Sequence, residues 1–362
     1  MSDRKLATIR RIKELRPIAG ADKIECAKVD GWELVVKKGE FNVGDLAIYV
    51  EVDSKLPEKI EFEFMRTRGF KVKTIKLRGQ VSQGILFPLT YLPPNTRVIE
   101  GADVTEKMGI TNYKDAIEIK DPKVPPSKVL SFLMSYRITR PIGKLYLKIF
   151  KYKNKEVFPS FIVKTDEERI QNKSNFLEYC EEFYITEKLD GQSATYFIKR
   201  VGTFRRIFGV CSRNQWLKTP HDCSWWKIAK KYNIEKFLRA KTFDLYIQGE
   251  LCGPGIQGNK YGLKEVELFL FNAYDLKNRH FLSHLDLDIL SRGIGCRIVP
   301  RLRDLEQSIN HSMSTSELVE LSKGNSILHN TPREGYVIRE TRDDIKSSVK
   351  VINPDFLLKH DE

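Results

Sequence analysis

Short runs in which apolar and polar residues alternate, separated by glycine-containing turns, fill the first ninety residues of the chain. Such alternation is typical of half-buried strands, because successive side chains of a strand point to opposite faces. The four clearest runs lie at residues 33–37, 46–51, 72–77 and 84–88. Short strands at this spacing predict a small β-barrel.

The last hairpin of this barrel combines positive charge with an aromatic residue. Six cations lie close to Phe70 in the sequence: Arg66, Arg68, Lys71, Lys73, Lys76 and Arg78. If the barrel is an OB-fold, this surface suits a nucleic-acid strand, because bases stack on aromatic rings while cations follow the phosphates. A solvated strand face with Phe70 in the core explains the same residues equally well.

Between residues 90 and 155 the regular pattern is lost, and prolines interrupt the chain repeatedly. This segment therefore predicts a linker that includes a helix or two. From Asp121 to Ser160 it holds nine lysines and arginines against two acidic residues, with aromatic residues among them. Such a stripe could follow a phosphate backbone, and a solvated amphipathic surface explains it at least as well.

From residue 157 onward the chain mixes strand and helix patterns, as in an α+β domain. Capping signals predict helices that begin at Thr165, Ser224 and Ser314. The second of these extends to residue 238, and Gly324 ends the third. The predicted strands are residues 193–198, 207–212, 244–251, 268–276, 335–339 and 347–352. We therefore divide the chain into a barrel at 1–90, a basic linker at 91–155 and a second domain at 156–362.

Composition adds a preference for polyanionic partners. Lysine and arginine exceed the acidic residues by 62 to 48, a formal charge of +14, and a basic surface binds polyanions through counterion release. The six cysteines include no Cys-x-x-Cys pair, which argues against a zinc site and against a disulfide framework. No segment reads as a signal peptide or a membrane helix. We expect an intracellular protein, cytoplasmic or nuclear.

One glycine-rich segment matches a nucleotide-binding pattern by letter only. Gly253–Gly258 fits G-x-G-x-x-G, but that fingerprint requires a helix to open within the glycines, and a strand pattern follows here instead. The segment therefore predicts a loop. The sequence contains no Walker A motif either, so a nucleotide must be bound by other means.

Lys188 is the strongest candidate for covalent chemistry. In Lys188-Leu-Asp-Gly191 an amine stands at a turn with a carboxylate two residues later. A lysine becomes a nucleophile when its pKa is lowered, which a neighbouring cation and partial burial can achieve. Taken alone, the four residues are also compatible with a plain surface turn.

Five further motifs follow Lys188–Gly191 in a defined order. They are Cys211–Asn214, Tyr246–Glu250, Leu268–Asp275, Glu334–Arg339 and Lys350. With them the sequence resembles the covalent nucleotidyltransferase superfamily of ligases and capping enzymes, and most closely ATP-dependent RNA ligases with an N-terminal OB module. The resemblance covers most of the chain. It implies an α+β fold, in which an OB-like β-barrel precedes a nucleotidyltransferase domain of antiparallel sheets and helices.

The resemblance also implies a role for each motif residue. Lys188 would form the lysyl–AMP bond, and Lys350 would neutralise the α-phosphate. Many relatives carry a second lysine where this chain has Ser348. Of the two aromatic residues, Phe271 is the candidate to stack on adenine in preference to Phe269, although a core strand explains both. The predicted nucleotide-binding residues are Lys164, Asp190, Gly191, Arg213, Glu250, Phe271 and Glu334, and Asp190, Glu250 and Glu334 are also the predicted ligands of Mg²⁺ or Mn²⁺.

The function that this resemblance implies is ATP-dependent joining of RNA ends with a 3′-hydroxyl and a 5′-phosphate, by a monomer acting on nicked duplexes. Capping enzymes and most DNA ligases carry the OB domain after the last motif, so the order found here favours an RNA ligase. A ligase for DNA or mixed nicks stays open, because one contact to a 2′-hydroxyl can decide between the sugars. A non-catalytic nucleic-acid-binding protein is the other alternative.

Overall fold

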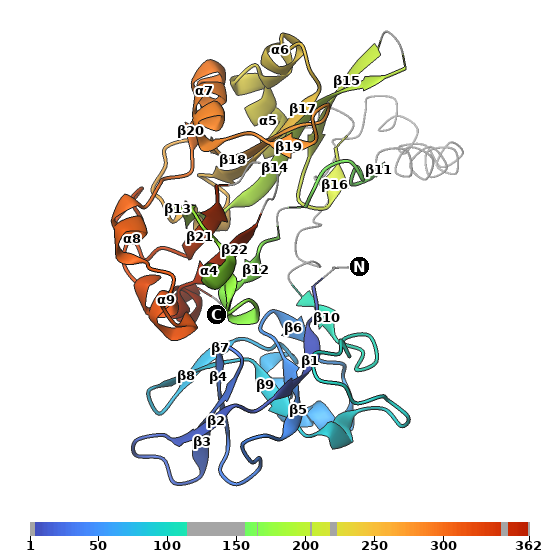
Figure 1. The fold of residues 1–362 in the computed structure, drawn as a ribbon. Helices are drawn as coiled ribbons and strands as arrows, with labels where there is room; N and C mark the ends of the chain where they lie inside the picture. The colour runs from blue at the N-terminus through green and yellow to red at the C-terminus, as the bar shows by residue number, and fades with distance from the viewer. Residues whose placement is uncertain are drawn as a thin grey trace, which may run out of the picture.

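The computed structural model describes residues 4–113, 156–164, 166–202, 205–217, 223–341 and 347–360. The predicted linker helix and most of the basic stripe lie outside them. Figure 1 shows an N-terminal β-rich module, blue to cyan, next to a larger α+β body. Among the described helices, none combines the length and apolarity needed to span a bilayer.

The N-terminal module is built from short antiparallel strands, as the alternation predicts. All four predicted strands are present, with shifts of one or two residues at their ends. One sheet has the order β1-β5-β9 and another the order β2-β3-β4, while β7 pairs with β8 and β6 with β10. The strands are β1 (Ala7–Arg11), β2 (Glu14–Pro17), β3 (Ile24–Val29), β4 (Trp32–Lys37), β5 (Leu46–Val50), β6 (Ser54–Lys55), β7 (Thr74–Leu77), β8 (Gln80–Gln83), β9 (Ile85–Phe87) and β10 (Thr111–Asn112).

Three features of this module decide between or correct the sequence expectations. Phe70 is only 3% exposed and belongs to the core, so the core interpretation of this residue is correct. The segment before it, η1 (Ile60–Arg68), is a 3-10 helix, so Arg66 and Arg68 do not lie on the hairpin to which the sequence analysis assigned them. Val104 and Ile110 pack in the same core as Ile48, so that core draws on residues beyond the boundary placed at residue 90.

The larger body contains two mixed sheets. The first has the order β11-β16-β15-β14-β17-β18-β19 with β20 beside β18, and the second the order β12-β22-β21-β13. All six predicted strands are confirmed. The strands are β11 (Glu156–Val157), β12 (Glu168–Arg169), β13 (Phe183–Lys188), β14 (Gln192–Val201), β15 (Arg205–Cys211), β16 (Gln215–Trp216), β17 (Leu245–Cys252), β18 (Glu267–Asp275), β19 (His280–Phe281), β20 (Arg297–Ile298), β21 (Gly335–Glu340) and β22 (Ser348–Ile352).

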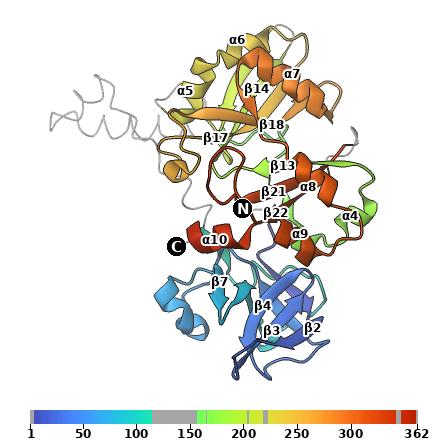
Figure 2. The ribbon, with the colours of Figure 1, turned by 90° about the vertical axis from the view of Figure 1, so that its left-hand side faces the viewer.

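Helices cover the outer side of each sheet. Figure 2 shows α5, α6 and α7 over the first sheet, α8 and α9 beside the second, and α10 between the larger body and β7. The apolar faces of α5, α6 and α7 pack on β14, β17 and β18. The helical segments are η2 (Leu89–Tyr91), η3 (Ile170–Asn172), α4 (Phe176–Tyr179), α5 (Ser224–Lys231), α6 (Ile234–Arg239), η4 (Gln257–Asn259), α7 (His284–Ile294), α8 (Arg303–Ser308), α9 (Thr315–Leu321) and α10 (Pro354–His360).

The helix predictions have mixed outcomes. The capping box of Ser314 is present at the start of α9, although that helix ends at Leu321, before Gly324. The helix expected at 225–238 is divided into α5 and α6 by Asn233, which has a left-handed φ of 48°. The helix expected to follow the Thr165 capping pattern is wrong, because Glu168 and Arg169 form β12, which pairs with β22. Tertiary pairing overrides the local capping signal in that segment.

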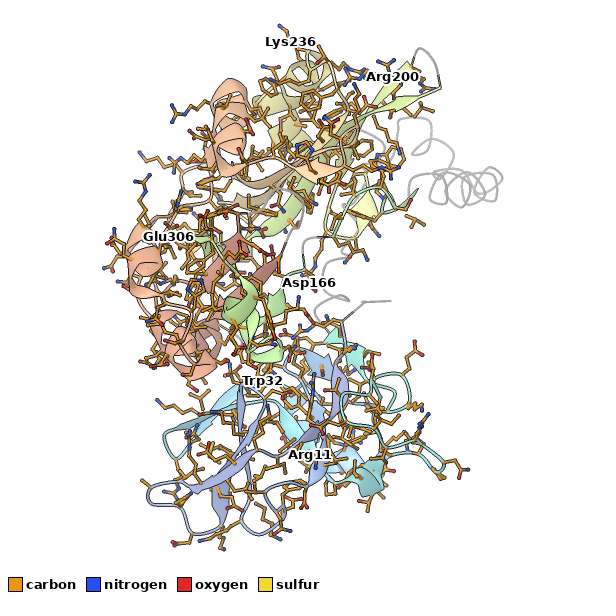
Figure 3. All side chains as sticks on the ribbon, viewed as in Figure 1. Arg11, Trp32, Asp166, Arg200, Lys236 and Glu306 are labelled. Carbon is orange, nitrogen blue, oxygen red and sulfur yellow. The ribbon has the colours of Figure 1, made fainter. Side chains whose placement is uncertain are left out.

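The two modules meet in close backbone contact. The Trp32 Nε1 donates a hydrogen bond to the Asn172 Oδ1 at 2.8 Å, and Figure 3 shows Trp32 at the edge of its module that faces the larger body. The Gly31 amide donates to the Gln171 carbonyl at 3.3 Å. A Cβ at Gly31 would lie 2.7 Å from the Thr315 Cγ2 and 2.8 Å from the Gln171 Cα. Only glycine allows this approach.

A candidate active site between the modules

A cavity of about 380 Å³ lies where the N-terminal module faces the larger body. Pockets of this size enclose small ligands. Most of the wall comes from the larger body, and Arg4, Asp53 and Asn112 add a part from the N-terminal module. Figure 3 places Asp166, another lining residue, near the boundary between the two.

All but one of the predicted site residues line this cavity. Those that do are Lys188, Asp190, Gly191, Arg213, Glu250, Phe271, Glu334 and Lys350. Lys164 is exposed to solvent and does not belong to the wall. The motifs that the sequence spreads over more than 160 positions therefore converge on one site.

Sheet pairing explains how Lys188 reaches its neighbours. Lys188 ends β13 and pairs with Gly335 of β21, so Glu334 lies beside it. The Lys188 Nζ is 2.6 Å from the Glu334 Oε1. Gly191 allows β17 to approach, because a Cβ there would lie 2.8 Å from the Glu250 Cγ and would overlap the Leu251 carbonyl. The glycine of Lys-x-Asp-Gly thus brings a second carboxylate to the lysine.

Carboxylates dominate the electrostatic surroundings of Lys188. Burial lowers the pKa of Lys188, but Glu334, Glu250 and Asp190 outweigh burial and leave that pKa above its ordinary value. The lowered pKa expected for a nucleophile is therefore not found in this arrangement, and Lys188 is an ammonium near neutral pH. Positive charge near these carboxylates would be needed to release its proton.

Glu250 is the most strongly perturbed of these acids. The pKa of Glu250 is raised to about 8, mainly by burial and also by the like charges of Glu334 and Asp190, while Lys188 opposes the shift. Two carboxylates that share one small space cannot both ionise freely. A pKa shift of this kind within a cavity is typical of functional sites.

The donor atoms suit a hard divalent cation. Asp190, Glu250 and Glu334 offer carboxylate oxygens, which Mg²⁺ and Mn²⁺ prefer. Within the part of the chain that the structure describes, no three acidic, histidine or cysteine side chains gather closely enough to hold a metal by themselves. Mg²⁺ usually takes one or two carboxylates and completes its shell with water and substrate phosphates. The residues fit a metal of that kind.

Lys350 lies in a second charged cluster of the same wall. The Lys350 Nζ is 2.9 Å from the Asp166 Oδ1, and the Arg213 Nη2 is 3.3 Å from the Asp166 Oδ2. Burial raises the pKa of Asp166, yet Lys350 and Arg213 hold it well below its ordinary value. Burial lowers the pKa of Lys350, and Asp166 partly opposes that effect. The two predicted phosphate contacts, Lys350 and Arg213, thus share one acidic partner.

The sequence analysis missed Asp166, although it lies inside the segment that contains Lys164. The capping pattern around Thr165 suggested a helix, whereas β12 instead pairs Arg169 with Lys350. This pairing places Asp166 within reach of Lys350. The signal was present as an acidic residue close to Lys164, a predicted nucleotide-binding residue, but its partner stands 184 positions away.

A β-bulge distinguishes Phe271 from Phe269. Gln248 pairs with Asn272 and Gly249 with Leu270, so Phe271 is the extra residue of β18. Its half-buried ring lines the cavity, while Phe269 is fully buried. The Arg339 guanidinium lies 5.7 Å from the centroid of the Phe271 ring. An aromatic face exposed to the cavity suits a stacked base.

A dry cluster of charges joins the modules beside the cavity. The Arg4 guanidinium is 2.6 Å from the Glu51 Oε1 and 2.9 Å from the Asp53 Oδ2. From the larger body, the Arg169 guanidinium is 3.6 Å from Glu51 and 3.5 Å from Asp53. The Arg169 group also lies 5.6 Å from the centroid of the Trp32 ring. We call Arg4, Glu51, Asp53 and Arg169 the interface cluster; sequence analysis gave no signal for it.

Comparisons with known proteins agree with this geometry. A family model for an OB-fold domain matches residues 6–89, and a model for RNA ligase matches residues 181–352. No curated protein sequence matches the chain.

Solved structures of an RNA ligase from Naegleria gruberi are similar over the whole chain. An apo mutant has a TM-score of 0.79 at 31% identity and covers 100% of this chain and 99% of its own. A mutant with ATP and Mn has a TM-score of 0.78 at 31% identity, with 99% of both chains covered. The enzyme with PPi has a TM-score of 0.78 at 32% identity and the same coverage.

Proposed function

This chain belongs to the RNA ligase family, and from that premise we propose that it uses ATP to join a 3′-hydroxyl to a 5′-phosphate in RNA. The observation that carries the proposal is the position of Lys188. Its amine lies in a cavity lined by Glu334, Glu250, Arg213 and Lys350. An amine next to carboxylates and phosphate-binding cations suits attack on a nucleotide α-phosphate.

The reaction would proceed in three balanced transfers. The Lys188 amine loses a proton and attacks the α-phosphate of ATP, so that a phosphorus–nitrogen bond forms and pyrophosphate leaves. The AMP group then passes to the 5′-phosphate of an RNA end, which restores the lysine. The neighbouring 3′-hydroxyl finally attacks the activated phosphate, and AMP leaves as the phosphodiester forms. The cavity mainly contributes orientation and charge.

Each cation of the wall has a role in this scheme. Lys350 and Arg213 would exchange Asp166 for phosphate oxygens, because an anionic ligand competes for the same charges. Phe271 would stack on the adenine. For Lys164 we keep a role in binding the nucleotide at the cavity entrance, which its exposed position permits.

Asp190, Glu250 and Glu334 would hold Mg²⁺ or Mn²⁺ together with phosphate oxygens and water. The metal supplies positive charge, which offsets the carboxylates around Lys188 and the charge that builds up on the phosphate. The residues themselves then act as follows: Glu334 orients the Lys188 amine through their 2.6 Å contact, and the turn at Gly191 keeps Glu250 close to it.

The RNA substrate is proposed from the charge of the protein. We propose a nicked duplex, bound by a monomer whose OB module and basic linker contact the phosphates. We keep the domain boundaries at residues 90 and 155, although Val104 and Ile110 also pack in the core of the first module. The formal charge of +14 supports a polyanionic partner. The cysteines are all free thiols in the described structure, which supports an intracellular location, cytoplasmic or nuclear.

The test is transfer of label from α-labelled ATP to the protein in the presence of Mg²⁺. Wild type is expected to become labelled and Lys188→Ala to stay unlabelled, with Lys236→Met as a control for an exposed lysine outside the wall. An unlabelled wild type would favour the non-catalytic alternative. Labelling of Lys188→Ala would show that another residue is the nucleophile.

A second measurement separates RNA from DNA. Pre-adenylylated nicks that differ only in the sugar at the 3′-hydroxyl terminus are sealed without ATP, so the assay isolates the last step. Preference for the RNA terminus supports the proposal. Equal rates would favour the mixed-substrate alternative.

A further inference from the structure

Two consecutive residues of one loop hold Asp190 from both ends. The Asp190 amide donates a hydrogen bond to the Tyr261 Oη at 2.7 Å. The preceding residue, Lys260, donates from its Nζ to the Asp190 carboxylate. The proposed reaction assigns neither Lys260 nor Tyr261 a role, although Lys260 lines the cavity. The loop directly follows Gly253–Gly258, the glycine-rich segment that only resembled a dinucleotide fingerprint.

The loop backbone fixes where Lys260 stands. Gln257 and Asn259 have left-handed φ values of 44° and 49°. The Asn259 side chain is bonded to both backbone groups of Leu263, at 2.9 Å and 3.1 Å. Tyr261 is 4% exposed and packs with Leu189. A side chain that starts from such a pinned backbone loses little freedom when it forms an ion pair.

Lys260 also has an aromatic partner in the cavity wall. Its Nζ lies 4.8 Å from the centroid of the Phe356 ring, on α10. Phe356 is 5% exposed, and α10 packs against β7 of the N-terminal module. The Lys260 side chain itself is 16% exposed and that of Asp190 18%. A cation between a carboxylate and an aromatic face is stabilised by both.

We propose that Lys260 is a built-in counter-cation of Asp190, which occupies the carboxylate that a divalent metal would otherwise bind. The inference rests on the proposed function only in its choice of Asp190 as a metal ligand. A metal must then displace the ammonium before it can use Asp190, so the metal and Lys260 compete. Meanwhile the hydrogen bond from the Asp190 amide to the Tyr261 Oη keeps Asp190 in place beside Lys188.

The competition can be measured without any reaction. Mn²⁺ is titrated into the full chain in the absence of ATP and RNA, and free Mn²⁺ is followed by its electron paramagnetic resonance signal. Lys260→Met removes the charge but keeps an unbranched side chain that can pack on Phe356. We expect it to bind Mn²⁺ up to about fivefold more tightly than wild type, because one partly exposed ion pair no longer opposes the metal.

Two controls assign the effect to this pair. Lys264→Met makes the same change in net charge at an exposed position outside the cavity wall, and it should bind Mn²⁺ as wild type does. Adding Asp190→Asn to Lys260→Met should abolish the gain, because the carboxylate is then gone.

Other results of these titrations would contradict the Lys260 proposal, and they can be told apart from a failure of the proposed function. If Lys260→Met binds Mn²⁺ no better than wild type, or if neither protein binds it, the proposal is wrong. If Lys260→Met loses affinity for ATP in metal-free buffer while its Mn²⁺ affinity is unchanged, Lys260 binds phosphate instead. Failure of wild type to take up label from ATP would refute the proposed function without altering the Mn²⁺ comparison.

Discussion

Two sets of ion pairs lie at or beside the cavity, and they differ in the exposed fraction of their side chains. In the interface cluster each arginine contacts both acids, and the side chains are only 3–17% exposed. In the second set each lysine has one acidic partner, Lys188 with Glu334, Lys260 with Asp190 and Lys350 with Asp166, and these side chains are 12–37% exposed. We call these three the cavity pairs.

The difference separates charges that hold the modules together from charges that can change partner. Removing one member of a dry pair leaves an uncompensated charge, which is costly. A partly wet pair can exchange its partner for a phosphate or a metal, because water replaces what is lost. The interface cluster should therefore determine stability, whereas the cavity pairs should determine activity.

The largest expected effect concerns a cavity pair. Lys188→Ala should reduce the rate of label transfer from ATP by at least about a thousandfold, since a missing nucleophile stops the step. Its free energy of unfolding should change by less than about 1 kcal/mol, as for other partly exposed pairs. Both are measured on the same preparation, by label transfer and by urea unfolding. A large loss of stability would contradict the comparison.

The next effect concerns the interface cluster. Arg169→Met should lower the free energy of unfolding by about 3 kcal/mol, because Glu51 and Asp53 lose one of two cations in a dry setting. Urea unfolding measures it. The control is Arg16→Met, which removes a pair with Glu33 at 41% and 26% exposure and should cost less than about 1 kcal/mol. Equal losses for both variants would remove the distinction between the two sets.

Close packing at the interface gives a third test. Gly31→Ala should lower the free energy of unfolding by about 1–2 kcal/mol, because the new Cβ overlaps two neighbours and overpacking has this magnitude. Adding Thr315→Ala should restore little, since the Gln171 Cα stays 2.8 Å from the Cβ. Full recovery in thermal or urea unfolding would show that the backbone can move and that the interface is adaptable.

The smallest effect is a dependence on pH. The pKa of Asp166 is depressed in the folded protein, so its contribution to stability is present above the ordinary pKa of about 4 and is lost as the pH falls below that value. The difference in urea midpoint between wild type and Asp166→Asn should therefore shrink from pH 6 to pH 3. A constant difference over this range would mean that Lys350 and Arg213 do not lower the pKa of Asp166 in the folded protein.

The two sets of pairs were unequally visible in the sequence. Lys188, Glu334 and Lys350 stand in recognisable motifs, and their order led to the family. Asp166 and Lys260 do not, because each has a partner that is remote in sequence, 184 and 70 positions away. The interface cluster joins Arg4, Glu51 and Asp53 of one module to Arg169 of the other, and no periodic pattern encodes such a contact.

Local sequence signals predicted secondary structure correctly where a segment showed one clear hydrophobic period or a capping motif. The alternation around 244–251 predicted β17, and the capping box at Ser314 predicted the start of α9. They failed where tertiary pairing prevailed, as at Thr165, where a capping pattern precedes a strand. The choice of Phe271 over Phe269 agrees with the cavity, but only the bulge in β18 explains why its ring faces that cavity.

The sequence by itself determined the strands, the OB-first order of the modules and the family of the motifs, because these depend on periodicity and on short segments. The tertiary structure decided which charges meet. It made Asp166 the shared partner of Lys350 and Arg213, placed Lys260 on Asp190 and raised the pKa of Lys188 through three carboxylates. Electrostatic energies depend on distance and burial in space, and neither is encoded in local sequence.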